Sequence, residues 1–240
     1  MKKLSIILLI LLFPAFAFAG GGATTMMMGA SGGAAAPTGI TFKDYAGSSS
    51  GIITKPATTA DGDLIIIWGV TNVVSALGTV PAGWTQIGTV QNAGTDSSTV
   101  CIYKIASSEG ATWDMSGLMA GAAKSYAIVY SGVDTTTPLD GVTPVQEYNT
   151  SGTACGAGPI TPAGNGRMIV AVYGCDPNAL TTGEPDDDPA CTERVDFSTS
   201  TDTYLYAQDY LQTTAAEVTL TATFSESRGH SWFTIVLRPQ

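Results

Sequence analysis

A single histidine limits the acid–base chemistry available to this chain. His230 is the one imidazole in 240 residues, and a serine–histidine–acid triad would need it as the general base. It stands at the mouth of the last predicted strand, and the matching position in the first half of the chain is Ala123. We therefore interpret His230 as a bystander and name no catalytic residue.

Hydrolysis of a glycosidic bond needs two carboxyl groups about 5–10 Å apart. The closely spaced acids are Asp61 with Asp63, Glu109 with Asp114, and the run at 186–188. Asp61 and Asp63 flank a glycine before a strand, which is typical of a turn. No predicted strand carries acids at alternate positions along one groove, as a jelly-roll glucanase does. The sequence favours a non-enzymatic protein, with a carbohydrate-active enzyme as the alternative.

One acidic loop carries the hard oxygen ligands that calcium prefers. It lies between Cys175 and Cys191, and a bond between these cysteines would close it. A solvated acidic loop is the alternative interpretation, and we expect no other cofactor. The candidate ligands are Asp176, Glu184, Asp186, Asp187 and Asp188.

Four cysteines in a chain with an export signal favour disulfide bonds. A zinc site is disfavoured because it needs ligands at short spacing, whereas these cysteines are far apart and histidine is scarce. Four cysteines allow three pairings, and the sequence does not choose among them. We favour Cys175 with Cys191, which leaves Cys101 with Cys155, and buried thiols are the alternative.

Aromatic side chains are the candidate ligand-binding residues. Tyr204, Tyr206 and Tyr210 share one face of a predicted strand because side chains alternate with a period of two. On an exposed face they would form a platform for sugar rings, and on an inner face they would be core. Trp84 and Trp113 fall near predicted loops, where binding residues concentrate.

The N-terminus has the pattern of a secretory signal peptide over residues 1–19. Two lysines precede an apolar stretch, and an Ala-Phe-Ala cleavage site follows it. The stretch from Leu4 to Phe13 is shorter than the roughly 20 residues that span a bilayer. We expect a secreted or cell-surface protein, with the periplasm as an alternative and no membrane insertion. Residues 20–39, rich in Gly, Ala and Met, predict a flexible linker.

The net charge of the chain limits the classes of partner that it can bind. The formal net charge is −10 at pH 7, which repels the phosphates of nucleic acids. Partners that carry glycans or lie at a cell surface remain compatible with it. The oligomeric state is left open.

Strand signals recur over residues 40–240, separated by Gly, Pro, Asp and Ser. Continuous apolar runs at 64–68 and 168–172 indicate strands that are central in a sheet or sandwich. No segment has a helical period. The prediction is an all-β protein whose residues 40–240 form one β-sandwich of jelly-roll type, with two immunoglobulin-sized domains as the alternative.

The two halves of this region, about 40–133 and 143–240, resemble each other. Four residues recur at a constant offset, and the halves end on similar apolar strands. The sequence therefore predicts an internal duplication whose halves superpose strand for strand. The matching pairs are Pro56 with Pro159, Thr58 with Thr161, Ala60 with Ala163, and Ile66 with Ile169.

An ordered set of motifs carries a family resemblance. These motifs are Gly62–Ile66, Pro81–Thr85, Tyr103–Ala106, Tyr130–Asp134, Thr192–Arg194 and Val236–Pro239. The set resembles a family of poorly characterised bacterial and phage-associated surface modules, β-sandwiches similar to concanavalin-like lectin folds. The resemblance implies an exported β-module and offers no catalytic residue that could be transferred to this chain. We expect the module to act by binding a ligand or by building a surface structure. A virion tail-fibre or decoration module is a third hypothesis.

Overall fold

The computed structural model shows an all-β protein. It describes residues 39–95, 97–119, 124–156, 158–175, 183–185, 189–198 and 203–240. The predicted signal peptide, and the linker up to residue 38, lie outside these ranges. Within them the structure has strands and no helix, and hence no helix long and apolar enough to cross a membrane.

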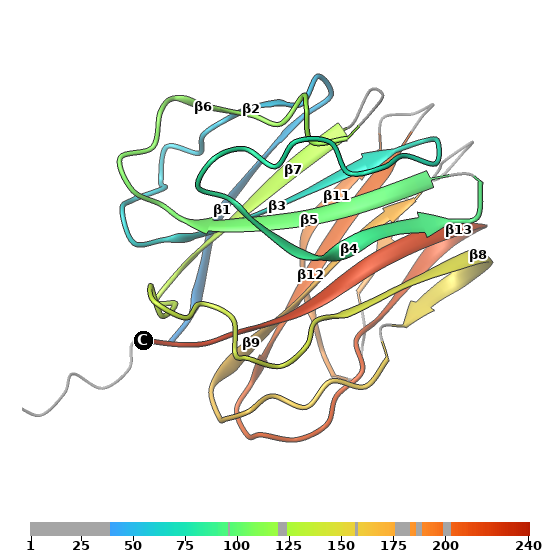
Figure 1. Cartoon of the computed structure of the whole chain (residues 1–240). Helices are drawn as coiled ribbons and strands as arrows, with labels where there is room; N and C mark the ends of the chain where they lie inside the picture. The colour runs from blue at the N-terminus through green and yellow to red at the C-terminus, as the bar shows by residue number, and fades with distance from the viewer. Residues whose placement is uncertain are drawn as a thin grey trace, which may run out of the picture. The chain divides into compact units, whose positions relative to one another are not determined.

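The first half of the chain forms one antiparallel sheet in the order β1-β7-β3-β5-β4 (Figure 1). A short ribbon of β2 and β6 is separate from this sheet and packs over its outer face. The strands are β1 (Thr41–Ser48), β2 (Ile52–Thr54), β3 (Leu64–Thr71), β4 (Thr85–Ala93), β5 (Ser97–Ile105), β6 (Thr112–Asp114) and β7 (Lys124–Ser131).

The second half forms the other sheet, in which β13 lies between β8 and β9, followed by β12 and β11. The strand β13 is long, and its first residues also pair with β10. The strands are β8 (Val145–Gly156), β9 (Arg167–Cys175), β10 (Gly183–Glu184), β11 (Thr192–Ser198), β12 (Tyr204–Gln212) and β13 (Thr221–Leu237).

Three apolar clusters hold these layers together. The central cluster lies between the sheets and includes Leu64, Ile66 and Val170. One outer cluster lies under β2 and β6, and the other covers the far face of the second sheet, where Ile169 is buried. Because β3 and β9 are covered on both faces, their sequences are continuous apolar runs rather than alternating ones.

The two sheets share one connectivity. The order β1-β7-β3-β5-β4 corresponds strand by strand to β8-β13-β9-β12-β11, with β3 and β9 in the same central place. A jelly roll is built from two Greek keys, whereas each sheet here comes from one half of the chain, so the jelly-roll type is not confirmed. A common origin of the halves stays a prediction.

The constant offset that relates the halves in sequence is wrong by one residue at the central strands. Ile66 faces the central cluster, whereas Ile169 faces the outer cluster. Because neighbouring strand residues point to opposite faces, the counterpart of Ile66 is Val170. The second half has one extra residue between Ala163 and Val170. An alignment fixed at Ala163 without a gap therefore places the strand one residue out.

Equivalent ion pairs mark the start of both central strands. Lys43 pairs with Asp63 at 2.7 Å, and Arg167 pairs with Asp140 at 2.5 Å. In each half an alanine N–H also donates to the carboxylate, from Ala60 to Asp63 and from Ala163 to Asp140. The acid and the base have exchanged places between the halves, since Asp63 and Arg167 occupy corresponding positions before Leu64 and Met168.

Candidate functional site

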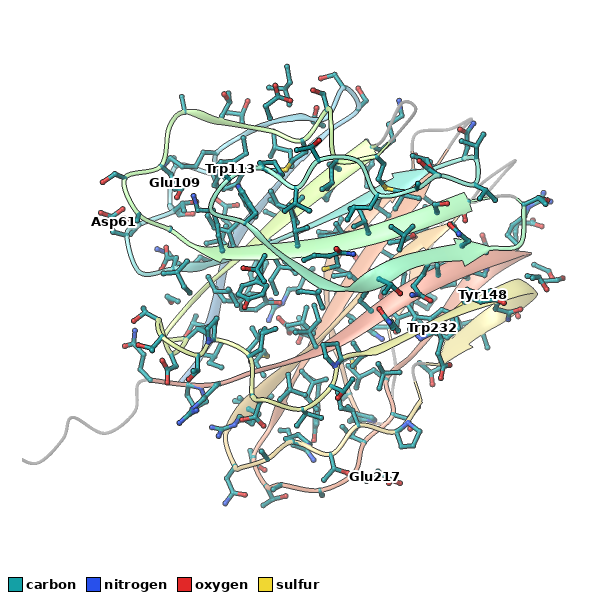
Figure 2. All side chains as sticks on the ribbon, in the orientation of Figure 1. Asp61, Glu109, Trp113, Tyr148, Glu217 and Trp232 are labelled. Atoms are coloured by element: carbon teal, nitrogen blue, oxygen red, sulfur yellow. The ribbon has the colours of Figure 1, made fainter. Side chains whose placement is uncertain are left out.

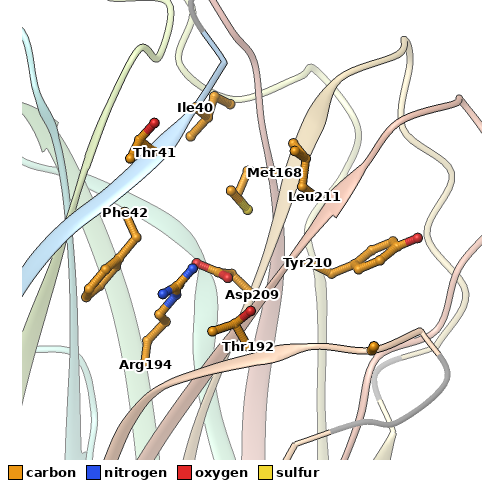
Figure 3. A pocket seen from close by; sticks show the side chains of 10 residues that line it. Ile40, Thr41, Phe42, Met168, Thr192, Arg194, Asp209, Tyr210 and Leu211 are labelled. Atoms are coloured by element: carbon orange, nitrogen blue, oxygen red, sulfur yellow. The ribbon is translucent and has the colours of Figure 1, made fainter.

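The two lateral edges of the sandwich differ. At the edge formed by β4 and β8, Gln146 fills a bulge in β4: its Oε1 accepts from the Thr89 N–H at 2.6 Å. At the other edge, formed by β1 and β11, the sheets leave a cleft of about 500 Å³ (Figure 3). The described residues lining it are Ile40, Thr41, Phe42, Met168, Ala190, Thr192, Arg194, Asp209, Tyr210 and Leu211.

Asp209 is the acidic group of this cleft. Side chains alternate between the two faces of β12, and Asp209 shares the inward face with Leu205 and Ala207. An apolar residue would be expected at its position. Asp209 is 2% exposed, so its charge needs partners inside the protein. An aspartate on the core face of a strand is the sequence signal that could have identified the site.

Arg194 reaches Asp209 because of a bulge in β11. The pairing of β11 with β12 shifts register between Glu193 and Val195, which leaves Arg194 as the extra residue. A bulge re-aims a side chain, and here the Nε of Arg194 donates to Oδ2 of Asp209 at 2.7 Å (Figure 3). The guanidinium also lies over the ring of Phe42 on β1, 4.5 Å from its centroid.

Tyr130 joins the pair from the opposite sheet. Its hydroxyl, on β7, donates to Oδ2 of Asp209 at 2.9 Å. Burial raises the pKa of Tyr130 well above its usual value, and the charge of Asp209 adds to this, so the phenol stays protonated and remains a donor. Phe42 packs edge-on against Tyr130 with ring centroids 5.7 Å apart. The site therefore draws on both sheets.

The fold does not require a charged pair at this position. Val170 pairs with Asp209 in the second sheet, and its counterpart Ile66 pairs with Tyr103 in the first. Tyr103 packs against the central apolar cluster. Since an uncharged, partly buried tyrosine fills the corresponding place, the Arg194–Asp209 pair is particular to the edge formed by β1 and β11.

The predicted tyrosine platform is divided between two environments. Tyr210 lines the cleft and is partly exposed. Tyr204 and Tyr206 lie on the outer face of the second sheet, where both are fully buried and Phe224 packs edge-on against each. The start of β13 folds over this face, so these two rings are core and present no surface to a sugar.

Trp84 and Trp113 form a structural cluster. Their rings meet edge to face, with centroids 6.1 Å apart. Nε1 of Trp113 donates to Glu109 at 2.9 Å (Figure 2). Glu109 also pairs with Lys104 at 2.7 Å, and Lys104 lies 5.5 Å from the centre of the Trp84 ring. Trp113 is buried and Trp84 half-buried, so neither forms an open stacking surface.

The carboxyl pairs considered for hydrolysis have structural contacts. Asp61 accepts from the Ser108 N–H, and Asp63 belongs to the Lys43 ion pair. Burial acts to raise the pKa of Glu109, but hydrogen bonds from Lys104, the Ser107 N–H and Trp113 outweigh it and lower the pKa. Asp114 accepts from Ser116. None of these acids is among the residues described as lining the cleft.

His230 is buried away from the cleft. Its Nε2–H donates to the carbonyl of Gly152 at 2.9 Å, and its ring stacks on Phe224 at 4.5 Å. Burial lowers its pKa to about 4, against the opposing effect of the Gly152 bond. The imidazole is therefore neutral at physiological pH and sits in the outer core.

The predicted disulfides are wrong, since none of the four cysteines is disulfide-bonded. Cys101 lies in the central cluster and Cys155 in the outer one, with the second sheet between them. Cys175 is opposite Tyr204 on β12, whereas Cys191 precedes the residue opposite Asp209. Five residues of strand span about 17 Å, far beyond the roughly 7 Å limit between bonded Cα atoms.

The predicted calcium loop falls mainly outside the described residues. Asp176, Asp186, Asp187 and Asp188 are not described, and Glu184 is exposed on β10. Within the described part of the chain, no group of three or more His, Cys, Asp or Glu side chains is arranged to hold a metal ion. The calcium site stays a prediction.

No family model, no curated protein and no solved structure matches this chain. The resemblance to lectin-like surface modules therefore rests on the sequence motifs alone.

Proposed function

We propose that the protein is an exported, non-enzymatic binding module that holds carbohydrate in the cleft between β1 and β11. The Arg194–Asp209 pair supports this most directly. It is a charged pair at an open cleft, in a position where the other sheet carries Tyr103, which is partly buried and packs against the central cluster. A buried ion pair adds little to the stability of a fold, and this pair, unlike that of Arg167 with Asp140, lines a cleft that a ligand can enter.

The composition of the cleft supports a sugar as the ligand. Its volume of about 500 Å³ falls within the range of small-molecule sites. Apolar side chains and the ring of Tyr210 form its walls, while Arg194 and Asp209 supply hydrogen bonds. A sugar has the same combination, with C–H faces for the apolar wall and hydroxyls for the polar pair.

The glycosidase alternative receives less support from this geometry. Hydrolysis through two carboxyl groups needs both of them beside the scissile bond. Among the described residues that line the cleft, Asp209 is the one acid, and it is held by Arg194 and Tyr130. We therefore assign binding to the cleft and assign no bond cleavage.

A glycan array tests this proposal. The purified protein, expressed with its own N-terminal segment, should bind a defined subset of glycans. Thr192→Trp adds a large side chain at an exposed lining position and should reduce the signals at least tenfold. Thr85→Trp, at the exposed first residue of β4 in the other sheet, is the matched control and should bind normally. Absence of binding by the wild type, or equal binding by Thr192→Trp, would reject the proposal.

A further inference from the structure

The charges at the cleft cancel. Arg194 and Asp209 are the two charged residues among those described as lining it, and they form an ion pair at 2.7 Å. The chain as a whole is acidic, with a net charge of −10. An anionic ligand would meet the carboxylate of Asp209 within an acidic protein, and a cationic ligand would meet Arg194. Neither sign of charge is favoured at this site.

The hydrogen-bonding groups of the pair are only partly used. Arg194 donates through Nε alone, and its bond and that of Tyr130 both end on Oδ2 of Asp209. Among the described residues, nothing bonds to the two Nη groups of Arg194 or to Oδ1 of Asp209. A guanidinium offers further N–H donors and a carboxylate oxygen accepts, so the cleft presents donors beside an acceptor.

A sugar hydroxyl both donates and accepts a hydrogen bond. Two hydroxyls on adjacent ring carbons can accept from Arg194 and donate to Asp209 at the same time. A carboxylate only accepts and an ammonium only donates, so each would leave one member of the pair without a partner and face a like charge. Unmatched polar groups at a binding site are costly, which makes such a site selective.

We infer that the Arg194–Asp209 pair makes the cleft selective for uncharged sugars with adjacent hydroxyls. Asp209 is the residue that excludes acidic sugars, because it neutralises Arg194. This inference rests on the proposed function and adds the class of ligand to it. It makes calcium unnecessary for recognition at this cleft, because the protein supplies both donor and acceptor.

Ligand-observed NMR with three matched methyl glycosides tests the selectivity. The probes are methyl glucoside, methyl glucuronide and methyl glucosaminide, at millimolar concentration in the presence of EDTA. We expect the glucoside to bind at least tenfold more tightly than either charged probe. Equal or tighter binding of a charged probe would overturn the inference while leaving carbohydrate binding in place. Absence of binding by all three, together with an empty glycan array, would reject the proposed function and this inference with it.

The variant Asp209→Asn separates charge from shape. It keeps the size of the side chain and removes its charge, so Arg194 becomes an uncompensated cation facing the cleft. The ratio of glucuronide to glucoside affinity should rise at least tenfold. Asp140→Asn is the matched control, since Asp140 is also buried and bonded to an arginine Nε but lies outside the cleft. The control should keep the wild-type ratio.

Folding of both variants is checked by urea denaturation before the affinities are compared. Should Asp209→Asn fail to fold, Arg194→Gln provides the opposite change, because it leaves Asp209 as an uncompensated anion. This variant should bind the glucosaminide better relative to the glucoside. An unchanged ratio in a folded variant at either position would contradict the inference.

Discussion

Asp209 shows how a buried charge is stabilised when two sheets meet over it. Its carboxylate is almost fully buried. It accepts one hydrogen bond from Tyr130 of the opposite sheet and one from Arg194 of its own sheet. Removing a donor from a buried carboxylate lowers the free energy of unfolding, whereas removing a tyrosine hydroxyl that makes no hydrogen bond changes it little. The residues of the site should therefore differ sharply in their effect on stability.

Tyr130→Phe should lower the free energy of unfolding by about 1–3 kcal/mol, because it removes a hydrogen bond to a buried carboxylate. Tyr126→Phe on the same face of β7 is the control, since none of the described residues hydrogen-bonds to its hydroxyl. It should cost less than 0.5 kcal/mol, as expected of a minor change (~0.5 kcal/mol or below). Urea denaturation at pH 7 measures both. Equal losses would show that the Tyr130–Asp209 bond contributes nothing.

His230 should make the protein sensitive to mild acid. Its pKa is about 4 in the folded protein and about 6.5 in an unfolded chain. The unfolded state therefore binds the extra proton first, and stability present above pH 6.5 is lost as the pH falls towards 4. The loss from this group should be about 2 kcal/mol between pH 7 and pH 5.

The variant His230→Gln isolates this contribution. Urea denaturation at pH 7, 6 and 5 measures the free energy of unfolding of both proteins. Between pH 7 and pH 5 the variant should lose about 2 kcal/mol less than the wild type. The comparison cancels the carboxylates that titrate in both proteins. Parallel pH profiles would show that His230 does not titrate in this window.

At the scale of elements, β-bulges decide what each edge of the sandwich does. The bulge in β4 has Gly88 at a positive φ of 61°, and Gln146 of β8 packs against it. The bulge in β11 turns Arg194 inwards instead, and a cleft remains. Edge strands in corresponding places therefore close the edge at β4 and β8 and leave a cleft at the edge of β1 and β11.

Gly88→Ala should destabilise the protein more than a positive φ alone explains. A Cβ at Gly88 would collide with Oε1 of Gln146, whereas Gly166, with a φ of 67°, has nothing within 4 Å of that position. Gly166→Ala should therefore cost about 1–2 kcal/mol from backbone strain, and Gly88→Ala about 1–3 kcal/mol more from overpacking. Thermal and urea unfolding measure the difference. Equal costs would show that Gln146 is not fixed in the bulge.

Strand positions could be predicted from the sequence, but the bulges could not. The apolar runs at 64–68 and 168–172 specify buried strands by composition alone, and β3 and β9 confirm them. A bulge changes the face of one residue without changing composition, so the direction of Arg194 is absent from the pattern. The alignment of Ile66 with Ile169 is wrong for a different reason, the extra residue that follows Ala163 in the second half.

At the scale of the whole molecule, the site depends on contacts between distant parts of the chain. Tyr130 and Asp209 are 79 residues apart in sequence, and Phe42 on β1 completes the wall. Strand periodicity indicates Tyr210 as a candidate, but nothing in the sequence indicates that Tyr130, Asp209 and Phe42 meet in the fold. Tyr204 and Tyr206 do not form the predicted sugar-binding platform, because Phe224 of β13 covers their rings. Strand periodicity does not indicate such a tertiary contact.

Reducing agents should not change the stability of the protein. The structure has no disulfide among its four cysteines, and burial raises the pKa of the Cys155 thiol to about 12. The free energy of unfolding should be the same with and without dithiothreitol. Native alkylation followed by mass spectrometry should leave Cys101 and Cys155 unmodified, whereas alkylation in urea should modify all four cysteines. A cross-linked peptide pair in the unreduced protein would contradict this account.

A crystal structure of the protein with the strongest glycan from the array tests the central claim most directly. The account predicts a sugar ring in the cleft between β1 and β11, with neighbouring hydroxyls within hydrogen-bonding distance of the Nη atoms of Arg194 and Oδ1 of Asp209. It also predicts that the Tyr130 bond to Asp209 persists in the complex. A glycan bound elsewhere on the protein, with the cleft unoccupied, would contradict the account.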